Sequence, residues 1–323
     1  MAFRSQFTNL MQADMYGWML EAYDKYTPVY PQIFNVQTMS GGFDHFTTGL
    51  GLGQLSERKE GDTIVASNPL EGFTIYAKAR TFSDSFFLTA EFVKDTPPEK
   101  IANVMRAFAG TWAEGVIASK ETFAAKLFKY GGYTAGHDVF NNTITGVQTD
   151  PTGNLIYDGK PFFALTGNNH PTKGGATYYN SLGALNLTAP NIQTAYSLMA
   201  NTNNRDEKGE IIRLVPDVLV IPPALRFTAR QILESNGEVG TANNTINTAQ
   251  GLVTPIVWQY LSDTDAWFLG VRGKGITFYE RQSPEIDFYQ DEKDKKFYAT
   301  IDARWGATVD NWRYWTAANV STS

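Results

Sequence analysis

Residues 96–132 read TPPEKIANVMRAFAGTWAEGVIASKETFAAKLFKYGG and predict a long amphipathic helix. Apolar residues recur there every three or four positions, the spacing of one helix face. They are Ile101, Val104, Met105, Phe108, Trp112, Val116, Phe123, Leu127 and Tyr130. The order Thr96-Pro97-Pro98-Glu99 is typical of a capping box, and two glycines end the stretch. At about 1.5 Å per residue the rod would be roughly 50 Å long. Gly110 and Gly115 leave open the alternative of two helices in tandem.

Strand patterns precede this helix. Apolar and polar residues alternate over 73–80 and again over 86–92. The connecting residues 81–85 are mostly polar and few enough for a turn, so the two runs predict a β-hairpin. Such a hairpin is marginal alone and should pack on something else. An amphipathic helix is expected earlier, over residues 7–26, followed by an irregular stretch rich in glycine.

Strand and helix patterns also follow the long helix. A helix is expected around Ile192 to Met199. Residues 217–221 form an apolar run, after which Pro222-Pro223 open a helix that Gly237 ends. From Leu252 onward the chain reads as strands. In the last strand, alternate residues from Phe297 to Trp305 share one apolar face, which the long helix should cover. The expected fold class is α+β.

Composition excludes several kinds of function. The 323 residues carry 27 basic and 33 acidic side chains, a net charge of −6 that argues against a dedicated nucleic-acid binder. The chain has no cysteine, which excludes disulfides, thiolate metal sites and cysteine nucleophiles. No signal peptide precedes the first helix, and no apolar run reaches the roughly 18 residues of a membrane span. We therefore expect a protein made in the cytoplasm.

The sequence contains no recognisable motif for a catalytic or metal site. His45, His137 and His170 lie far apart, and nucleotide-loop, serine-nucleophile and zinc-protease motifs are missing. Asp263 with Asp265, and the charged run 291–296, could bind a cation, although a solvated edge is favoured. We predict a protein that is not an enzyme, with no catalytic residue, no cofactor and no metal. An α/β enzyme with an unrecognised site remains the alternative from another class.

The order of these parts resembles the major capsid proteins of tailed bacteriophages, which share the Hong Kong 97-like fold, and is nearest to the Mu-like phage major head proteins. The resemblance covers nearly the whole chain. It rests on NPLEGFTIYAKARTFSDSFFLT, ALTGNNHPTKGGATYYNSLGALN, PDVLVIPPALRFTARQILES and the run from SDTDAWFLGV to DNWR, in that order.

The resemblance implies a division of the chain. Residues 1–52 would be an N-terminal arm, 53–95 an extended β-hairpin loop (E-loop) and 96–135 the spine helix of a peripheral domain. Residues 136–270 would be an axial domain, and 271–323 would return as peripheral strands. An arm and a loop that project from the subunit should lie on neighbouring copies.

It also implies self-assembly. Pentamers and hexamers of this chain would form an icosahedral head around packaged double-stranded DNA. A portal and a separate scaffolding protein are expected as partners, decoration or cement proteins are left open, and no membrane is involved. An encapsulin-like compartment and a minor virion protein are the alternatives.

Two sets of residues are expected to serve assembly. Contacts with a neighbouring subunit are expected at Phe73, Ile75, Lys78, Arg80 and Phe86. Lys120, Lys126 and Lys129 give the end of the long helix a basic bias. They could face the lumen and its DNA, or simply complement the helix dipole.

Overall fold

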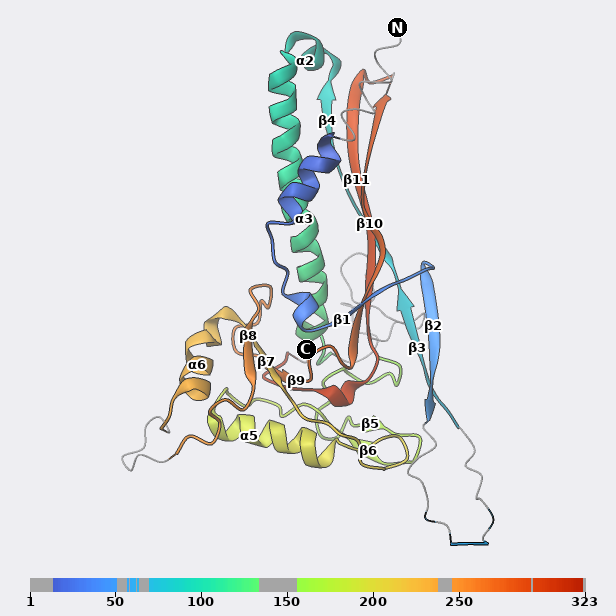
Figure 1. Cartoon of the computed structure of the whole chain (residues 1–323), viewed down its shortest axis with the longest axis vertical. Helices are drawn as coiled ribbons and strands as arrows, with labels where there is room; N and C mark the ends of the chain where they lie inside the picture. Colours follow the sequence, from blue (N-terminus) through green and yellow to red (C-terminus); the bar gives the residue numbers. More distant parts are fainter. Residues whose placement is uncertain are drawn as a thin grey trace.

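The long helix predicted from the sequence is the main element of the subunit (Figure 1). The structure is a computed structural model that describes residues 14–50, 57, 59–61, 63, 70–133, 156–237, 246–291 and 293–321. Helix α3 spans Pro98–Lys129 without interruption, so the alternative of two helices in tandem is wrong. Methyl groups added at Gly110 and Gly115 would meet nothing within 4 Å. Both glycines therefore lie on the open side of the helix, where they need no bend.

The start of α3 differs from the predicted capping box. Its N-cap is Pro97, which makes no side-chain capping bond. Thr96 instead ends a short helix, α2 (Ala90–Asp95), and its backbone N–H donates to the Phe92 carbonyl at 3.0 Å. Thr89 caps that helix by accepting a hydrogen bond from the Phe92 N–H at 3.2 Å. The hydroxyl that caps a helix here is thus Thr89, and the prediction at Thr96 is wrong.

A four-stranded sheet lies along α3, in the order β1-β10-β11-β4. Strands β10 (Ile276–Asp291) and β11 (Lys296–Val309) form a long antiparallel pair. Strand β4 (Arg80–Thr89) flanks β11, and β1 (Asn35–Thr38) pairs in parallel with β10. One face of β11 is buried at Ala299, Ile301, Ala303 and Trp305. Part of this face packs in one cluster with residues of α3, which confirms the prediction that the long helix covers the apolar face of this strand.

The predicted hairpin over residues 73–92 is wrong. Strand β3 (Leu70–Lys78) pairs with β2 (Phe43–Leu50), whereas β4 pairs with β11. Residues 81–85, predicted as a turn, are extended inside β4, where two of the polar side chains have partners. The Ser83 hydroxyl donates to Asp302, and the Trp112 indole N–H donates to Asp84 at 2.9 Å. Strands β3 and β4 therefore follow one another along one line (Figure 1).

A second four-stranded sheet forms the base of the subunit, in the order β12-β9-β7-β8. Its strands are β7 (Val218–Ile221), β8 (Thr254–Val257), β9 (Trp267–Gly270) and β12 (Trp315–Ala318). The predicted strand-to-helix unit is confirmed: a 3-10 turn (Pro223–Leu225) leads from β7 into α6 (Arg226–Glu234). The predicted helix around Ile192 is α5 (Ala189–Ser197), continued by a π turn (Leu198–Thr202). Short 3-10 turns η1 (Tyr30–Gln32) and η4 (Trp312–Tyr314) and a small pair, β5 (His170–Pro171) with β6 (Thr177–Tyr178), complete the elements.

The lower end of α3 joins the two sheets. Phe128 is fully buried, and its ring centroid lies 5.7 Å from Trp258, 5.0 Å from Phe268 and 5.1 Å from Trp315. All three partners belong to the base of the subunit, so α3 is inserted into the base at one end. The rings meet edge to face, a contact that adds to the stabilisation from apolar burial there.

The predicted N-terminal helix is described from Asp14, and its helical residues end at 23. Residues 7–13 of that prediction lie outside the described residues. Met15 and Met19 are buried in the cluster that α3 forms with β10 and β11. The helix therefore packs on the upper half of the subunit.

Burial at the end of β11 gives the subunit a pH-dependent stability. It raises the pKa of Asp310 to about 6, from 3.8, although a hydrogen bond from the Thr277 hydroxyl acts in the opposite direction. The folded state thus favours the protonated carboxyl, and Asp310 lowers stability as the pH rises from about 4 to 6. We expect Asp310→Asn to raise the free energy of unfolding by about 1–3 kcal/mol near pH 7.5, and to change it little below about pH 4. Thermal denaturation at both pH values measures this, and a variant less stable than the parent near neutral pH would contradict it.

Candidate assembly surfaces

The root of the β2–β3 hairpin crosses the main sheet closely. The Ala79 N–H donates to the Gly42 carbonyl at 3.0 Å, which closes the hairpin at its base. At Gly306 in β11, an added Cβ would lie 2.4 Å from the Lys78 carbonyl oxygen. A glycine is therefore needed there for the hairpin to pass over β11. From this point the hairpin diverges from the sheet and projects beside the base (Figure 1).

The β3 residues predicted to contact a neighbour have different surroundings. The Phe73 ring lies 4.7 Å from the Tyr157 ring, and the Lys173 ammonium lies 4.5 Å from the centroid of the Phe73 ring. Ile75 is only 2 % exposed, so its own chain already covers it. Lys78 is exposed at the end of the strand. Of these residues, Lys78 is the most available for another subunit.

The β4 residues of the same set face α3. Arg80 is half-buried, and burial lowers the pKa of its guanidinium. Phe86 is half-buried between two rings of α3, at 4.3 Å from Phe108 and 5.0 Å from Trp112. Both side chains contribute to packing inside the subunit. Their contact with a neighbour stays a prediction.

Lys120 does not fit the prediction of a lumen-facing basic residue. It is 4 % exposed, and its ammonium lies 2.6 Å from a carboxylate oxygen of Glu280. The same ammonium lies 5.8 Å from the ring centroids of Tyr23 and Trp305. The charge is thus buried and paired within the chain.

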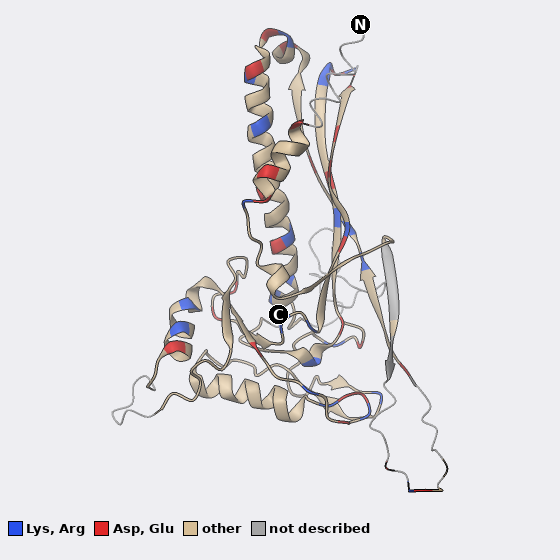
Figure 2. Cartoon of the chain, in the orientation of Figure 1, with Lys and Arg blue, Asp and Glu red and all other residues tan. Residues whose placement is uncertain are grey.

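Lys126 and Lys129 are half-buried in the last turns of α3. Burial lowers the pKa of Lys126, with a smaller contribution from the nearby charge of Arg80. The Lys129 ammonium lies 5.3 Å from the Tyr130 ring. Acidic and basic residues are interspersed along α3 as a whole (Figure 2). That these two lysines face the lumen stays a prediction.

A buried carboxylate beside Lys120 was missed by the sequence analysis. Glu121 is 2 % exposed and accepts hydrogen bonds from the Val29 N–H, the Tyr30 N–H at 3.3 Å and the Trp258 indole N–H at 2.5 Å. Tyr30 also donates its hydroxyl to Glu280 at 3.1 Å; burial and the Glu280 charge raise the tyrosine's pKa. Glu121 therefore ties the segment before β1 to α3 and to the base.

An outer face of the main sheet carries exposed aromatic rings. Phe87 is 51 % and Tyr289 52 % exposed, and the Tyr289 ring stacks on Tyr298 at 5.1 Å. The Lys296 ammonium lies 4.6 Å from the Phe87 ring centroid. Helix α3 packs on the opposite face, so these rings are open to a partner. Exposed apolar groups gathered in one place are typical of protein–protein contacts.

The residues considered for chemistry form no reactive site in the described part of the chain. Both side chains of the pair His170 and Asp158 are 0 % exposed, 2.7 Å apart, and the imidazole stacks on Trp312 at 4.4 Å. Such a pair holds loops together. The side chain of His45 and all of His137 lie outside the described residues. Burial and a hydrogen bond with Asp265 raise the pKa of Asp263.

Neither a metal site nor a membrane-spanning helix is present within the described ranges. No group of three or more histidine or acidic side chains is placed there to hold a metal ion. No described helix is long and apolar enough to cross a membrane. The features that stand out are projections and exposed rings, which are suited to association.

A family model described as "Phage capsid protein" matches residues 73–318, well over half of the chain. The chain belongs to this phage capsid protein family. The predicted function as a structural subunit of a phage capsid is thereby confirmed, and the match favours it over an encapsulin-like compartment. No curated protein sequence matches this capsid protein.

Solved structures of similar fold support the assignment of the fold. The capsid of a native GTA particle has a TM-score of 0.54 at 12% identity, covering 90% of this chain and 88% of that one. The procapsid of satellite phage P4, which includes a size determination protein, has a TM-score of 0.50 at 10% identity, with 95% and 91% covered. A virus-like particle from Pyrococcus furiosus has a TM-score of 0.50 at 8% identity, with 95% and 98% covered. The predicted α+β, Hong Kong 97-like fold is confirmed.

Proposed function

We propose that this chain is the major capsid subunit of a tailed phage, assembling with itself as pentamers and hexamers into an icosahedral head around double-stranded DNA. The observation that carries the proposal is the β2–β3 hairpin. It is a separate two-stranded sheet whose root crosses β11 and whose strands then diverge from the main sheet. Its own chain covers β3 only at residues such as Phe73 and Ile75, and because a two-stranded sheet is marginally stable by itself, a further surface beneath it would stabilise it. A neighbouring copy of the subunit supplies that surface.

The exposed rings of the main sheet support the same proposal. Phe87 and Tyr289 are each about half exposed on the face opposite α3. Apolar rings left in water on a projecting part of a subunit favour burial against another protein. In a shell, every subunit has neighbours on all sides that can cover such a face. Stability of the subunit would then depend in part on assembly.

The five regions of the chain remain a proposal, with one change. The pairing of β2 with β3 supports an extended loop over residues 43–78 in place of 53–95. The other regions keep their roles: an N-terminal arm, the spine helix α3, the axial base and the returning strands. The Mu-like major head proteins remain the relatives that we propose as nearest.

Partners follow from this role. A separate scaffolding protein and a portal would act during head assembly, while decoration or cement proteins stay open. Synthesis would take place in the host cytoplasm, and the mature subunit would be part of the virion. Lys126 and Lys129 are proposed to face packaged DNA, through charge and without sequence recognition.

Charge reversal at Lys78 tests the role of the hairpin. Lys78 is exposed where β3 meets the main sheet, and we propose that it meets acidic groups of a neighbour. Because a loss of about 1 kcal/mol is repeated at every contact of a shell, we expect Lys78→Glu to lower the yield of shells at least about tenfold. Electron microscopy and sedimentation of the assembled material measure this yield.

The matched control is Lys100→Glu, the same charge change at an exposed position in the first turn of α3. It should leave the yield of shells close to that of the parent. Equal yields for Lys78→Glu and the parent would show that this lysine makes no contact that assembly needs.

A further inference from the structure

Helix α6, at one side of the base, presents an aromatic ring between two cations to solvent (Figure 1). Phe227 is 78 % exposed, and the side chains of Arg226 and Arg230 are exposed beside it. These three residues are called the α6 patch. Arg230 pairs with Glu234 at 2.6 Å, whereas Arg226 has no salt bridge in the described part of the chain. Aromatic rings and arginines are enriched where proteins contact one another, so the patch suits a partner.

A cavity of about 400 Å³ in the base has the complementary chemistry. Leu165 and Val320 contribute apolar walls, and Asp263 and Asp265 contribute two carboxylates. Neither carboxylate has a salt bridge to a described residue of its own chain. A guanidinium beside them would stabilise their charged forms. This acidic cavity can therefore receive an aromatic ring that is flanked by arginines.

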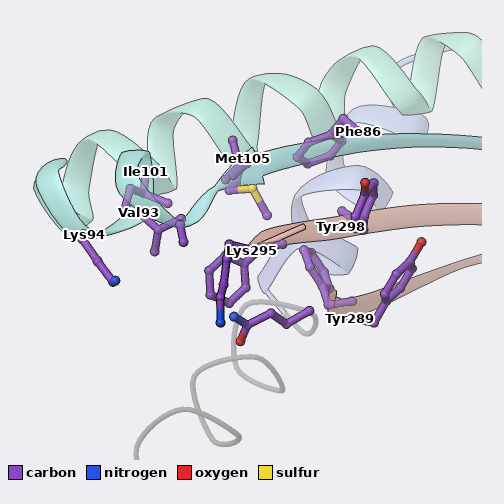
Figure 3. Close-up of a pocket in the computed structure, with 14 residues that line it drawn as sticks. Phe86, Val93, Lys94, Ile101, Met105, Tyr289, Lys295 and Tyr298 are labelled. Carbon is purple, nitrogen blue, oxygen red and sulfur yellow. The ribbon is translucent and has the colours of Figure 1, made fainter. Parts of the chain in front are cut away.

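Another cavity, of about 310 Å³, does not fit the α6 patch. It lies at the far end of the subunit from the base, between α2, the start of α3 and the ends of β10 and β11 (Figure 3). Lys94 and Lys295 stand at its edge, and the other labelled side chains are apolar or aromatic (Figure 3). Its lining includes no acidic residue of the described chain. Lysines would repel the arginines of the patch, so charge favours the acidic cavity.

The α6 patch and the acidic cavity belong to opposite faces of the base sheet. Adjacent residues of β7 face opposite ways, Leu219 into one apolar cluster and Val220 into another. Helix α6 packs in the cluster of Leu219 through Ala229. Val320, which lines the acidic cavity, packs against the cluster of Val220. Because the sheet separates the two surfaces, contact between them joins copies head to tail, and such contacts form rings when the rotation closes.

We propose that the α6 patch of one subunit docks in the acidic cavity of a second copy, with Phe227 between the apolar walls and the two arginines beside the two carboxylates. A second copy is the occupant because this chain carries both complementary surfaces, on faces that a ring brings together. Burial of the ring removes a large apolar area from water, and the paired charges fix its position. The inference rests on the proposed function and names the contact that joins subunits within a capsomer.

A cysteine pair tests the contact in assembled shells of the full chain, which has no cysteine of its own. Thr228 is exposed next to Phe227, and Ala184 lines the acidic cavity. We expect Thr228→Cys with Ala184→Cys to form disulfides on mild oxidation, seen on a non-reducing gel as a ladder of up to about five or six chains. The matched control is Ser197→Cys with Ala184→Cys, because Ser197 is exposed on α5, outside the patch. It should cross-link at least about tenfold more slowly.

An exchange of charges gives an independent readout. Arg226→Asp and Asp265→Arg should each lower the yield of shells at least about tenfold, because like charges would then meet. The two changes together should restore the yield to within about threefold of the parent. Both side chains are exposed, so the variants should stay folded, which circular dichroism checks. A double variant that assembles no better than the single variants would overturn the contact.

The cross-linking results separate this contact from the proposed function. Disulfides limited to dimers would overturn the contact, because a twofold arrangement gives no ladder. Equal rates for the Thr228 and Ser197 variants would overturn it as well. In both cases shells would still form, and the proposed function would stand. A parent chain that forms no shells would overturn the proposed function and the contact together.

Discussion

Replacement of Glu121 by alanine is expected to lower the free energy of unfolding by about 3–5 kcal/mol. The carboxylate is 2 % exposed and accepts hydrogen bonds from two backbone N–H groups and from the Trp258 indole. Alanine would leave these donors buried without an acceptor, and would leave a cavity between α3 and the segment before β1. Chemical denaturation followed by tryptophan fluorescence measures the loss.

Glu121→Gln separates charge from shape. The amide keeps one acceptor oxygen, so we expect a loss of about 1–3 kcal/mol, smaller than that of alanine. Thr122→Ala, at the exposed neighbouring position, should change stability by less than about 0.5 kcal/mol. If Glu121→Ala were as stable as Thr122→Ala, the carboxylate would not hold the two parts of the subunit together.

Shortening the β2–β3 hairpin is expected to abolish shells while the subunit still folds. Asp44 and Ala77 are directly opposite in the pair, so residues 45–76 can be replaced by Asn-Gly, which favours a two-residue turn. The root, with its bond from Ala79 to Gly42, is kept. Because the rest of the hairpin would pack on a neighbour, its loss should lower the yield of shells more than about a hundredfold. It should shift the midpoint of thermal unfolding by only a few degrees.

The same shortened chain distinguishes folding from assembly. Circular dichroism and size exclusion establish whether the subunit is folded, and microscopy establishes whether shells form. Normal shells from the shortened chain would show that the hairpin is not an assembly element. An unfolded chain would mean that the hairpin stabilises its own subunit, against the role proposed for it.

Elements with regular local patterns were predictable from the sequence. The stripe in α3 has a helical period over nine turns, and the alternation from Phe297 to Trp305 has a strand period. The unit around Pro222-Pro223 carries its own start signal for a helix. In each case one face of the element is buried, and the spacing of the apolar residues in the sequence shows which face it is.

Pairing between distant segments was not predictable. The run 81–85 looks like a turn because four of its five residues are polar, yet Ser83 and Asp84 have partners on β11 and α3. Neighbouring strands in sequence usually pair, and here the partner of β4 lies more than 200 residues away, as in Phe82 opposite Ala303. Register over such a distance depends on tertiary packing, which a local pattern does not contain.

The candidate assembly residues also differ in whether the local sequence or a distant partner determines their surroundings. Lys78 was expected to contact a neighbouring subunit, and its exposure at the end of β3 is compatible with that contact. Lys120 was assigned to a basic surface from its charge alone, although it lies four positions after Val116 and three before Phe123 on the apolar stripe. That position indicated burial, and Glu280 supplies the partner that makes burial of the charge possible. The partner, far along the chain, could not be identified from the sequence.

Cryo-electron microscopy of the chain expressed with its candidate scaffolding protein tests the central claim most directly. We expect closed shells with fivefold and sixfold capsomers, in which the β2–β3 hairpin of each subunit lies on a neighbour and the sheet face with Phe87 and Tyr289 is covered. A folded chain that remains a monomer, forming neither capsomers nor shells with or without the scaffold, would contradict it.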